Sequence, residues 1–231
     1  GEALTNALRR FQSSSDRVAI MASSNSKAFT VGADLTNPGD IWRFTPSVGV
    51  EVDKPIIAAV DGYCVGGGVV LVQFCDLCVV AESAVFSYPE AKVGVTGGLI
   101  SSLAARIPHK VAMEFVLYAS DMTAQRAYEV GFANKVVPAD QLMEASMEYA
   151  RTLKKHAPMV LSTLKRFAGE VINKGPLSGL ISSVQRQFTI PAVNDEEAVF
   201  TEVQVLERIS YPSVVSEGEN SAPSVESISL R

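Results

Sequence analysis

The stretch PIIAAVDGYCVGGGVVLVQFCDLCVVA, residues 55–81, decides the fold of this chain. It begins with the apolar run 55–60 and ends with the apolar run 77–81, and both runs are typical of buried strands. Between them, three glycines at 66–68 open an apolar segment, residues 69–74, that suits a buried helix. The order strand, glycine turn, helix, strand indicates parallel pairing. We therefore predict an α/β fold.

Apolar periodicity extends this prediction to the rest of the chain. Towards the N-terminus it predicts an amphipathic helix at 2–12 and a buried strand at 17–22. Towards the C-terminus it predicts helices at 111–118, 123–130 with Thr123 as N-cap, 139–155, 158–173, 177–188 and 195–209. The Ser/Glu/Pro-rich tail after Tyr211 has too little apolar content to fold alone. We expect residues 1–170 to form the α/β core and residues 171–231 a helical oligomerisation region with a polar tail.

Composition and charge exclude several classes of protein. With 231 residues, 47% of them hydrophobic, the chain can bury a sizeable core. A net charge of −5 argues against nucleic acid or an anionic membrane as a partner, and no apolar run is long enough to span a bilayer. The three cysteines lie in an apolar stretch, which favours a reducing compartment and a cytoplasmic location. The chain opens at Gly1 in a helical pattern, so we expect that an N-terminal piece precedes it.

Two glycine turns are the candidate binding elements: KAFTVGADL at 27–35 and DGYCVGGG at 61–68. Glycine lets the backbone approach a ligand closely, and a helix that begins after such a turn leaves N–H groups free to donate. Two such turns brought together would form an oxyanion hole with two donors. Each turn alone is better explained as a tight connection between a strand and a helix. Neither has the spacing of a nucleotide-binding glycine loop.

Four strings, in this order, resemble the crotonase (enoyl-CoA hydratase/isomerase) superfamily over residues 15–140: KAFTVGADL, DKPIIAAVDGYCVGGG, CDLCVVAESAVFSYPEAKVGV and TAQRAYEVGFANKVVP. The resemblance implies a core of repeated β-β-α turns followed by a helical C-terminal region. It implies an acyl-CoA thioester as substrate, and no separate cofactor because coenzyme A is part of that substrate. It also implies a homotrimer or a dimer of trimers.

The resemblance assigns roles to residues of both glycine turns. It implies that the backbone N–H groups of Ala33 and Gly67 bind the thioester oxygen. The residues that it implies in contact with coenzyme A are Asp34, Leu35 and Thr36 along its length and Lys27, Ala28 and Phe29 near the adenine.

The resemblance implies that a hydratase of this family uses two carboxylates, and this chain departs from that pattern. Val70 stands at the position of the first carboxylate and can neither accept nor donate a proton, whereas Glu90 stands at the position of the second. One carboxylate can still move a proton between two carbons of a substrate whose enolate is stabilised. We therefore predict double-bond isomerisation, with Glu90 as acid and base in an apolar pocket that raises its pKa. The simpler interpretation of Glu90 is a solvated carboxylate in a turn.

Three alternatives stay open beside isomerisation. The protein is a hydratase that works with Glu90 alone, a non-catalytic binder of CoA thioesters, or an interaction subunit. A metal site is not expected: Cys75 and Cys78 form a single C-x-x-C pair, and only His109 and His156 accompany them. We interpret these cysteines as residues of a buried strand.

Overall fold

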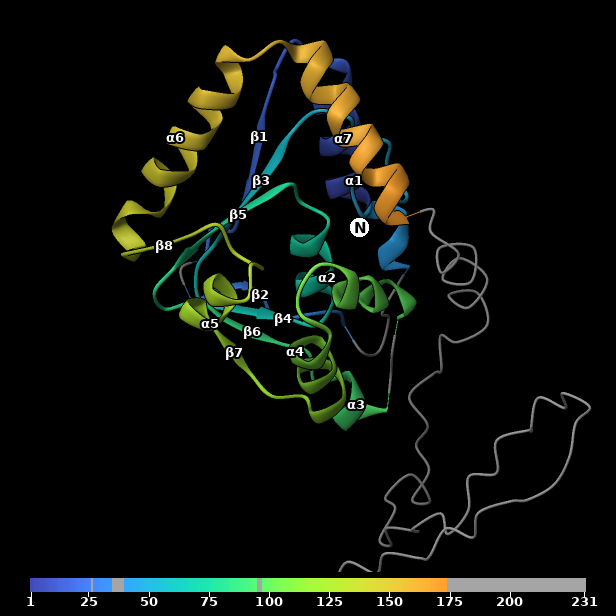
Figure 1. The fold of residues 1–231 in the computed structure, drawn as a ribbon, viewed down its shortest axis with the longest axis vertical. Coiled ribbons are helices and arrows are strands. Elements are labelled where there is room, and N and C mark those ends of the chain that lie inside the picture. The colour runs from blue at the N-terminus through green and yellow to red at the C-terminus, as the bar shows by residue number, and fades with distance from the viewer. Residues whose placement is uncertain (26, 35–39, 95–96, 174–231) are drawn as a thin grey trace, which may run out of the picture. The chain divides into compact units, whose positions relative to one another are not determined.

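The computed structural model describes residues 1–25, 27–34, 40–94 and 97–173 (Figure 1). The chain divides into two units, Gly1–Asn194 and Asp195–Arg231, and all described residues belong to the first. The helices predicted at 177–188 and 195–209 and the polar tail lie outside the described residues, as do Leu35 and Thr36.

Four parallel strands form the first sheet, in the order β1-β3-β5-β8. Their bounds are Ala19–Ala22 for β1, Ile56–Val60 for β3, Leu77–Ala81 for β5 and Lys135–Val137 for β8. Every residue of β3 is buried, because β3 lies between two strands and has protein on both faces. The strands predicted at 17–22, 55–60 and 77–81 are confirmed, whereas β8 was not predicted.

The second sheet has the order β2-β4-β6-β7, and β7 runs antiparallel to β6. Its strands are short: Ala28–Thr30 (β2), Tyr63–Val65 (β4), Val85–Ser87 (β6) and Met122–Thr123 (β7). β2 and β4 were predicted only as parts of the two glycine turns, and β6 and β7 were not predicted, because strands of two or three residues carry no readable alternation. The chain passes from the first sheet to the second and then into a helix, which gives the repeated β-β-α turns that were predicted.

Seven α-helices occur in the described ranges: α1 (Glu2–Ser13), α2 (Gly67–Gln73), α3 (Glu90–Val93), α4 (His109–Met113), α5 (Ala124–Glu129), α6 (Leu142–Lys155) and α7 (Pro158–Asn173). Thr123 is the N-cap of α5, as predicted, and its Oγ1 accepts a hydrogen bond of 3.2 Å from the Arg126 N–H. The helix predicted at 111–118 begins earlier and changes type, because α4 continues as a π-helical segment, Glu114–Tyr118. No helix in these ranges has the length and apolarity needed to cross a membrane.

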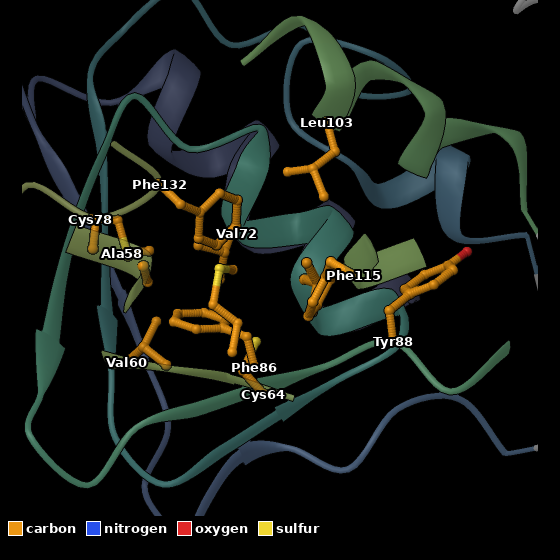
Figure 2. Packing of buried hydrophobic residues seen from close by; sticks show 14 of the residues in the cluster. Ala58, Val60, Cys64, Val72, Cys78, Phe86, Tyr88, Leu103, Phe115 and Phe132 are labelled. Atoms are coloured by element: carbon orange, nitrogen blue, oxygen red, sulfur yellow. The ribbon is translucent and has the colours of Figure 1, made fainter. Parts of the chain in front are cut away.

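The main core lies between the two sheets, and α2 runs through it. Figure 2 shows Val72 of α2 beside Phe86 of β6 and Phe132. The rings of Phe86 and Phe132 meet edge to face with centroids 5.1 Å apart. Val69 is fully buried and Val70 is 3% exposed. Because its valines are held on several sides, α2 fixes the glycine turn that precedes it.

Candidate functional site

The two glycine turns predicted to act together lie side by side. β2 and β4 pair in parallel, so the turns that follow them leave the sheet at the same edge. A Cβ atom added to Gly32, whose φ is +96°, would lie 3.6 Å from the carbonyl oxygen of Val65. On the other turn, a Cβ atom added to Gly68 would lie 2.1 Å from Cγ2 of Thr30. Gly32 is therefore required for its positive φ, and Gly68 is required because a Cβ atom there would overlap the Thr30 methyl group.

The turn before α2 presents backbone donors. Gly66 is the N-cap with φ +57° and ψ −117°, and its N–H donates to the Ser87 carbonyl at 2.8 Å. The Val69 N–H donates a hydrogen bond of 3.0 Å to the Gly66 carbonyl. None of the backbone bonds in the turns, loops and helix caps of the described residues uses the N–H of Gly67 or that of Ala33 as donor. These two amides are the pair predicted to form the oxyanion hole.

A cavity of about 850 Å³ brings residues of both turns onto one surface. Its size falls within the range of roughly 300–1,000 Å³ that is usual for small-molecule sites. Ala33, Asp34 and Gly67 are among its lining residues. The residues predicted to bind the thioester oxygen and Asp34, predicted to contact coenzyme A, therefore line one cavity.

Two further segments, α1 and a 3₁₀ turn, also line the cavity. Thr5 and Arg9 stand on the polar face of α1, and Ile41 and Trp42 belong to a 3₁₀ turn, Ile41–Phe44. Cδ1 of Ile41 would lie 2.5 Å from a Cβ atom on Gly67, so this side chain covers the turn. The spacing along α1 predicted an amphipathic helix but no part in a site. The 3₁₀ turn lies within residues 41–51, on which the depth of the pocket was expected to depend.

Glu90 stands beside the second glycine turn. It is the first residue of α3, directly after β6 and Pro89. A Cβ atom on Gly66 would lie 2.7 Å from its Oε1. The other oxygen, Oε2, is buried and has no hydrogen-bond partner among the described residues. Glu90 and Gly66 are not among the described residues that line the cavity, whereas Gly67 and Gly68 of the same turn do line it.

The electrostatic setting of Glu90 suits proton transfer near neutral pH. Burial raises the pKa of its carboxyl group from 4.5 to about 7, and a hydrogen bond from its own backbone N–H opposes this rise. No charged side chain is among the causes of the shift. A carboxyl group with this pKa exists in both protonation states at neutral pH, as a group that accepts and returns a proton requires.

Val70 lies on α2 and packs into the main core. It occupies the position at which the resemblance implies a second carboxylate in hydratases. It is 3% exposed and brings no polar group to the site. Among the residues assigned to the adenine side, Ala28 and Phe29 belong to β2 and Lys27 precedes it. Phe29 packs against the main core. These three are not among the described residues that line the cavity.

The cysteines show no sign of metal or nucleophilic chemistry. All three are free thiols, and burial raises the pKa of each of them above its usual value. A thiol must lose its proton to bind a metal or attack a substrate, so these are poor candidates for either role. Over the residues that the structure describes, no group of three His, Cys, Asp or Glu side chains gathers as a metal site would require.

Comparison with known proteins gives one consistent result. The family model for Enoyl-CoA hydratase/isomerase matches residues 47–177. A carnitinyl-CoA dehydratase of Salmonella typhi is 36% identical over 164 residues, which are 64% of this chain and 62% of that relative. The aligned part of the chain thus spans 62% of the length of this curated relative.

Solved structures agree with the sequence matches. A carnitinyl-CoA hydratase from Mycobacterium avium has a TM-score of 0.70 and 30% identity, and the match covers 85% of this chain and 80% of that one. An enoyl-CoA hydratase from the same organism has a TM-score of 0.72 and 26% identity, with 81% and 84% of the two chains covered.

Proposed function

The chain belongs to the enoyl-CoA hydratase/isomerase family of the crotonase superfamily, and we propose that it moves a proton within an acyl-CoA thioester, with Glu90 as acid and base. The observation that carries this proposal is that Glu90 lies against the second glycine turn while Val70 is buried in the core. Oε1 of Glu90 lies against Gly66, directly before the proposed oxyanion donor Gly67. Val70 is packed in the core and supplies no second acid or base.

The oxyanion hole in this proposal is made by the backbone N–H groups of Ala33 and Gly67. When a proton leaves the carbon next to the thioester, negative charge develops on the thioester oxygen. Donors already aimed at that oxygen stabilise the charge without having to reorganise. The shared cavity supports this role, because Ala33 and Gly67 both line it.

Glu90 completes the reaction in two steps. Its carboxylate first takes a proton from a substrate carbon, and the electrons of the broken C–H bond pass into the enolate. The carboxyl group then returns the proton to another carbon of the same system, which moves the double bond and restores the carboxylate. No water is consumed, so the single acid/base group is sufficient.

Coenzyme A enters and leaves as part of the substrate, and no further cofactor or metal is proposed. Asp34, Leu35 and Thr36 contact coenzyme A along its length in this proposal. Its adenine lies near Lys27, Ala28 and Phe29. The position of Asp34 on the cavity wall supports the first assignment.

A second candidate is addition or removal of water with Glu90 alone. The names of the relatives favour it, since they are a carnitinyl-CoA dehydratase and hydratases. A third candidate, a binder of CoA thioesters without turnover, is favoured by Val70.

One set of assays separates the three candidates. The protein is incubated with 2-enoyl-CoA and 3-enoyl-CoA, and the products are resolved by chromatography, with Glu90→Gln and Val70→Glu alongside. Isomerisation that Glu90→Gln abolishes supports the proposal, and formation of hydroxyacyl-CoA by the parent supports the hydratase. Binding without any product, with hydration gained in Val70→Glu, would identify a binder whose catalytic pair has been dismantled.

The assembly proposed for the protein is a homotrimer or a dimer of trimers. Large apolar side chains on α7 support an interface between copies: Met159 is 81% exposed, Phe167 61% and Leu164 58%. Light scattering on the purified protein gives the mass of the assembly and tests this. A cytoplasmic location, without nucleic acid or membrane as partner, stays a prediction, and the free thiols support it.

A further inference from the structure

The helix that carries Glu90 is too short to hold its own position. α3 has four residues. The N–H groups of Lys92 and Val93 donate hydrogen bonds to the Pro89 carbonyl at 2.8 Å and 3.2 Å. A helix of one turn is unstable by itself, because fixing its backbone dihedrals costs more than its few hydrogen bonds return. Gly94, with φ +71°, ends it. The direction of α3, and with it that of the Glu90 carboxyl group, depends on contacts with the rest of the molecule.

Lys92 makes such a contact. Its Nζ donates a hydrogen bond of 2.8 Å to the carbonyl of Ala119, which follows the π-helical segment Glu114–Tyr118. The last carbonyls of a helix have no partner inside the helix and carry partial negative charge, so an ammonium group suits this position. The bond joins two segments that lie 27 residues apart in the sequence.

The acceptor end of this contact is fixed. Ala119 is 3% exposed and has φ 52° and ψ 45°, a left-handed conformation that is uncommon for a residue with a Cβ atom. Phe115, within the π-helical segment, is 2% exposed and points into the main core (Figure 2). Such π-helical turns occur frequently at functional sites. The Ala119 carbonyl is therefore a well-fixed acceptor for the ammonium group of Lys92.

Lys92 and Glu90 leave α3 in different directions. Residues two apart in a helix are separated by about 200° around the axis. Glu90 points towards Gly66, whereas the ammonium group of Lys92 reaches the Ala119 carbonyl. The pKa of Glu90 is raised by burial and lowered by its own N–H, and Lys92 does not contribute. Any effect of Lys92 on the Glu90 carboxyl group therefore comes from the position of α3 and not from the charge of Lys92.

We propose that Lys92 is a positioning residue for the reaction: its bond to Ala119 holds α3 so that the Glu90 carboxyl group stays against Gly66. This inference rests on the proposed role of Glu90. It gives Lys92 no contact with the substrate. It also explains how an otherwise exposed, one-turn helix can present an acid/base group in a fixed place.

The test compares Lys92→Met, which keeps the length of the side chain and removes the donor, with Lys92→Arg, which keeps a donor. Lys110→Met, on α4, is the matched control because Lys110 is an exposed lysine of the helix that leads into the same π-helical segment. In Lys92→Met we expect kcat to fall roughly ten- to hundredfold, since displacement of a catalytic group by about 1 Å has effects of this size. We expect KM to change little, and Lys92→Arg to recover most of the rate.

A carboxyl titration provides a readout that needs no turnover. The pKa of Glu90, followed by the ¹³C shift of its carboxyl carbon, should fall from about 7 towards 4.5 in Lys92→Met, because a displaced carboxyl group gains water. An unchanged Glu90 pKa with unchanged kcat overturns the inference. So does an equal loss of rate in Lys92→Arg accompanied by a lowered Tm, which shows a general structural role.

Glu90→Gln, measured in parallel, separates this inference from the proposed function. Full turnover in Glu90→Gln removes the proposed acid/base role, and the titration then decides on Lys92 alone. Loss of turnover in Glu90→Gln together with parental behaviour of Lys92→Met keeps the proposed function and rejects the positioning role.

Discussion

Two successive turns of the fold carry the proposed chemistry, and they are held in different ways. The turn β3-β4-α2 ends in a seven-residue helix whose valines are buried in the main core. The turn β5-β6-α3 ends in a four-residue helix of which Ala91 to Val93 are exposed. The core packing of the first turn continues through its helix, whereas in the second turn Phe86 and Tyr88 are buried in the main core and the helix after them is largely exposed.

This difference follows the chemistry assigned to each turn. An oxyanion hole works by donors that do not reorganise, so the backbone N–H of Gly67 needs a rigid support. A carboxyl group that accepts and returns a proton needs a raised pKa, and partial burial supplies it. Complete burial would keep the group away from the substrate. Substitutions in each turn test whether the two turns are separable in this way.

The largest effect is expected for Glu90→Gln, which removes the acid/base group of the second turn and keeps its shape. Turnover should fall by about 10²–10⁴-fold. In the parent, kcat/KM should rise with pH through a single ionisation near 7, because Glu90 must be ionised to accept the proton. The pH profile of the parent and the residual rate of the variant are the measurements. A parental rate in Glu90→Gln would place the chemistry elsewhere.

The same substitution has a predicted effect on stability. The pKa of Glu90 is raised in the folded state, so the contribution of this group to stability is complete below about pH 4.5 and is lost as the pH rises to about 7. Glu90→Gln should remove that loss and be more stable than the parent at pH 8. We expect a gain of about 1 kcal/mol, a value reduced for the partial exposure of the group. Urea unfolding at pH 4.5 and pH 8 measures it.

Gly66→Ala tests the point where the two turns meet. Its Cβ atom would lie 2.7 Å from Oε1 of Glu90, and φ +57° with ψ −117° is a conformation that alanine rarely adopts. We expect a loss of about 1–3 kcal/mol of stability and a fall in kcat of roughly a hundredfold from the displaced carboxyl group. Gly131→Ala is the matched control, because Gly131 also has a positive φ, +80°, and no atom within 4 Å of an added Cβ. Equal kcat in the two variants would show that Gly66 matters only for its backbone.

Gly68→Ala tests the rigidity of the first turn. The added Cβ atom would lie 2.1 Å from Cγ2 of Thr30, across the contact between the two glycine turns. We expect a loss of about 1–3 kcal/mol, the usual effect of overpacking. Thr30→Ser removes that methyl group and keeps the hydroxyl that accepts the Gly32 N–H at 3.2 Å. In a double-mutant cycle, Thr30→Ser should recover most of the loss, and additive effects would show that strain is relieved elsewhere.

The parts of this molecule that could be predicted from sequence are those with a long or repeated pattern. The apolar runs at 55–60 and 77–81 indicated buried parallel strands, and the glycine spacings indicated both turns. β2, β4 and β6 could not be predicted, because three residues are too few to show a period and their pairing depends on contacts distant in sequence.

The residues of the candidate site also fall into those that could be predicted from the sequence and those that could not. Ala33, Gly67 and Glu90 stand in strings with a family pattern, so a resemblance was sufficient to name them. Ile41 covers Gly67 and Lys92 binds the Ala119 carbonyl, but neither stands in a local motif. Their contacts arise only when segments far apart in sequence come together, and side-chain chemistry alone does not reveal such partners.

The smallest effect is expected for Thr123→Ala, which removes the N-cap of α5 and leaves both turns untouched. Its Oγ1 accepts the Arg126 N–H at 3.2 Å, and loss of such a cap costs about 1 kcal/mol. Thr123→Ser keeps the hydroxyl and should retain stability. We expect kcat of Thr123→Ala to equal that of the parent, because α5 contributes to neither the cavity nor the contact at Gly66. A fall in kcat would mean that the second turn depends on β7 and α5 as well as on Lys92, and that its position is set by the whole edge of the sheet.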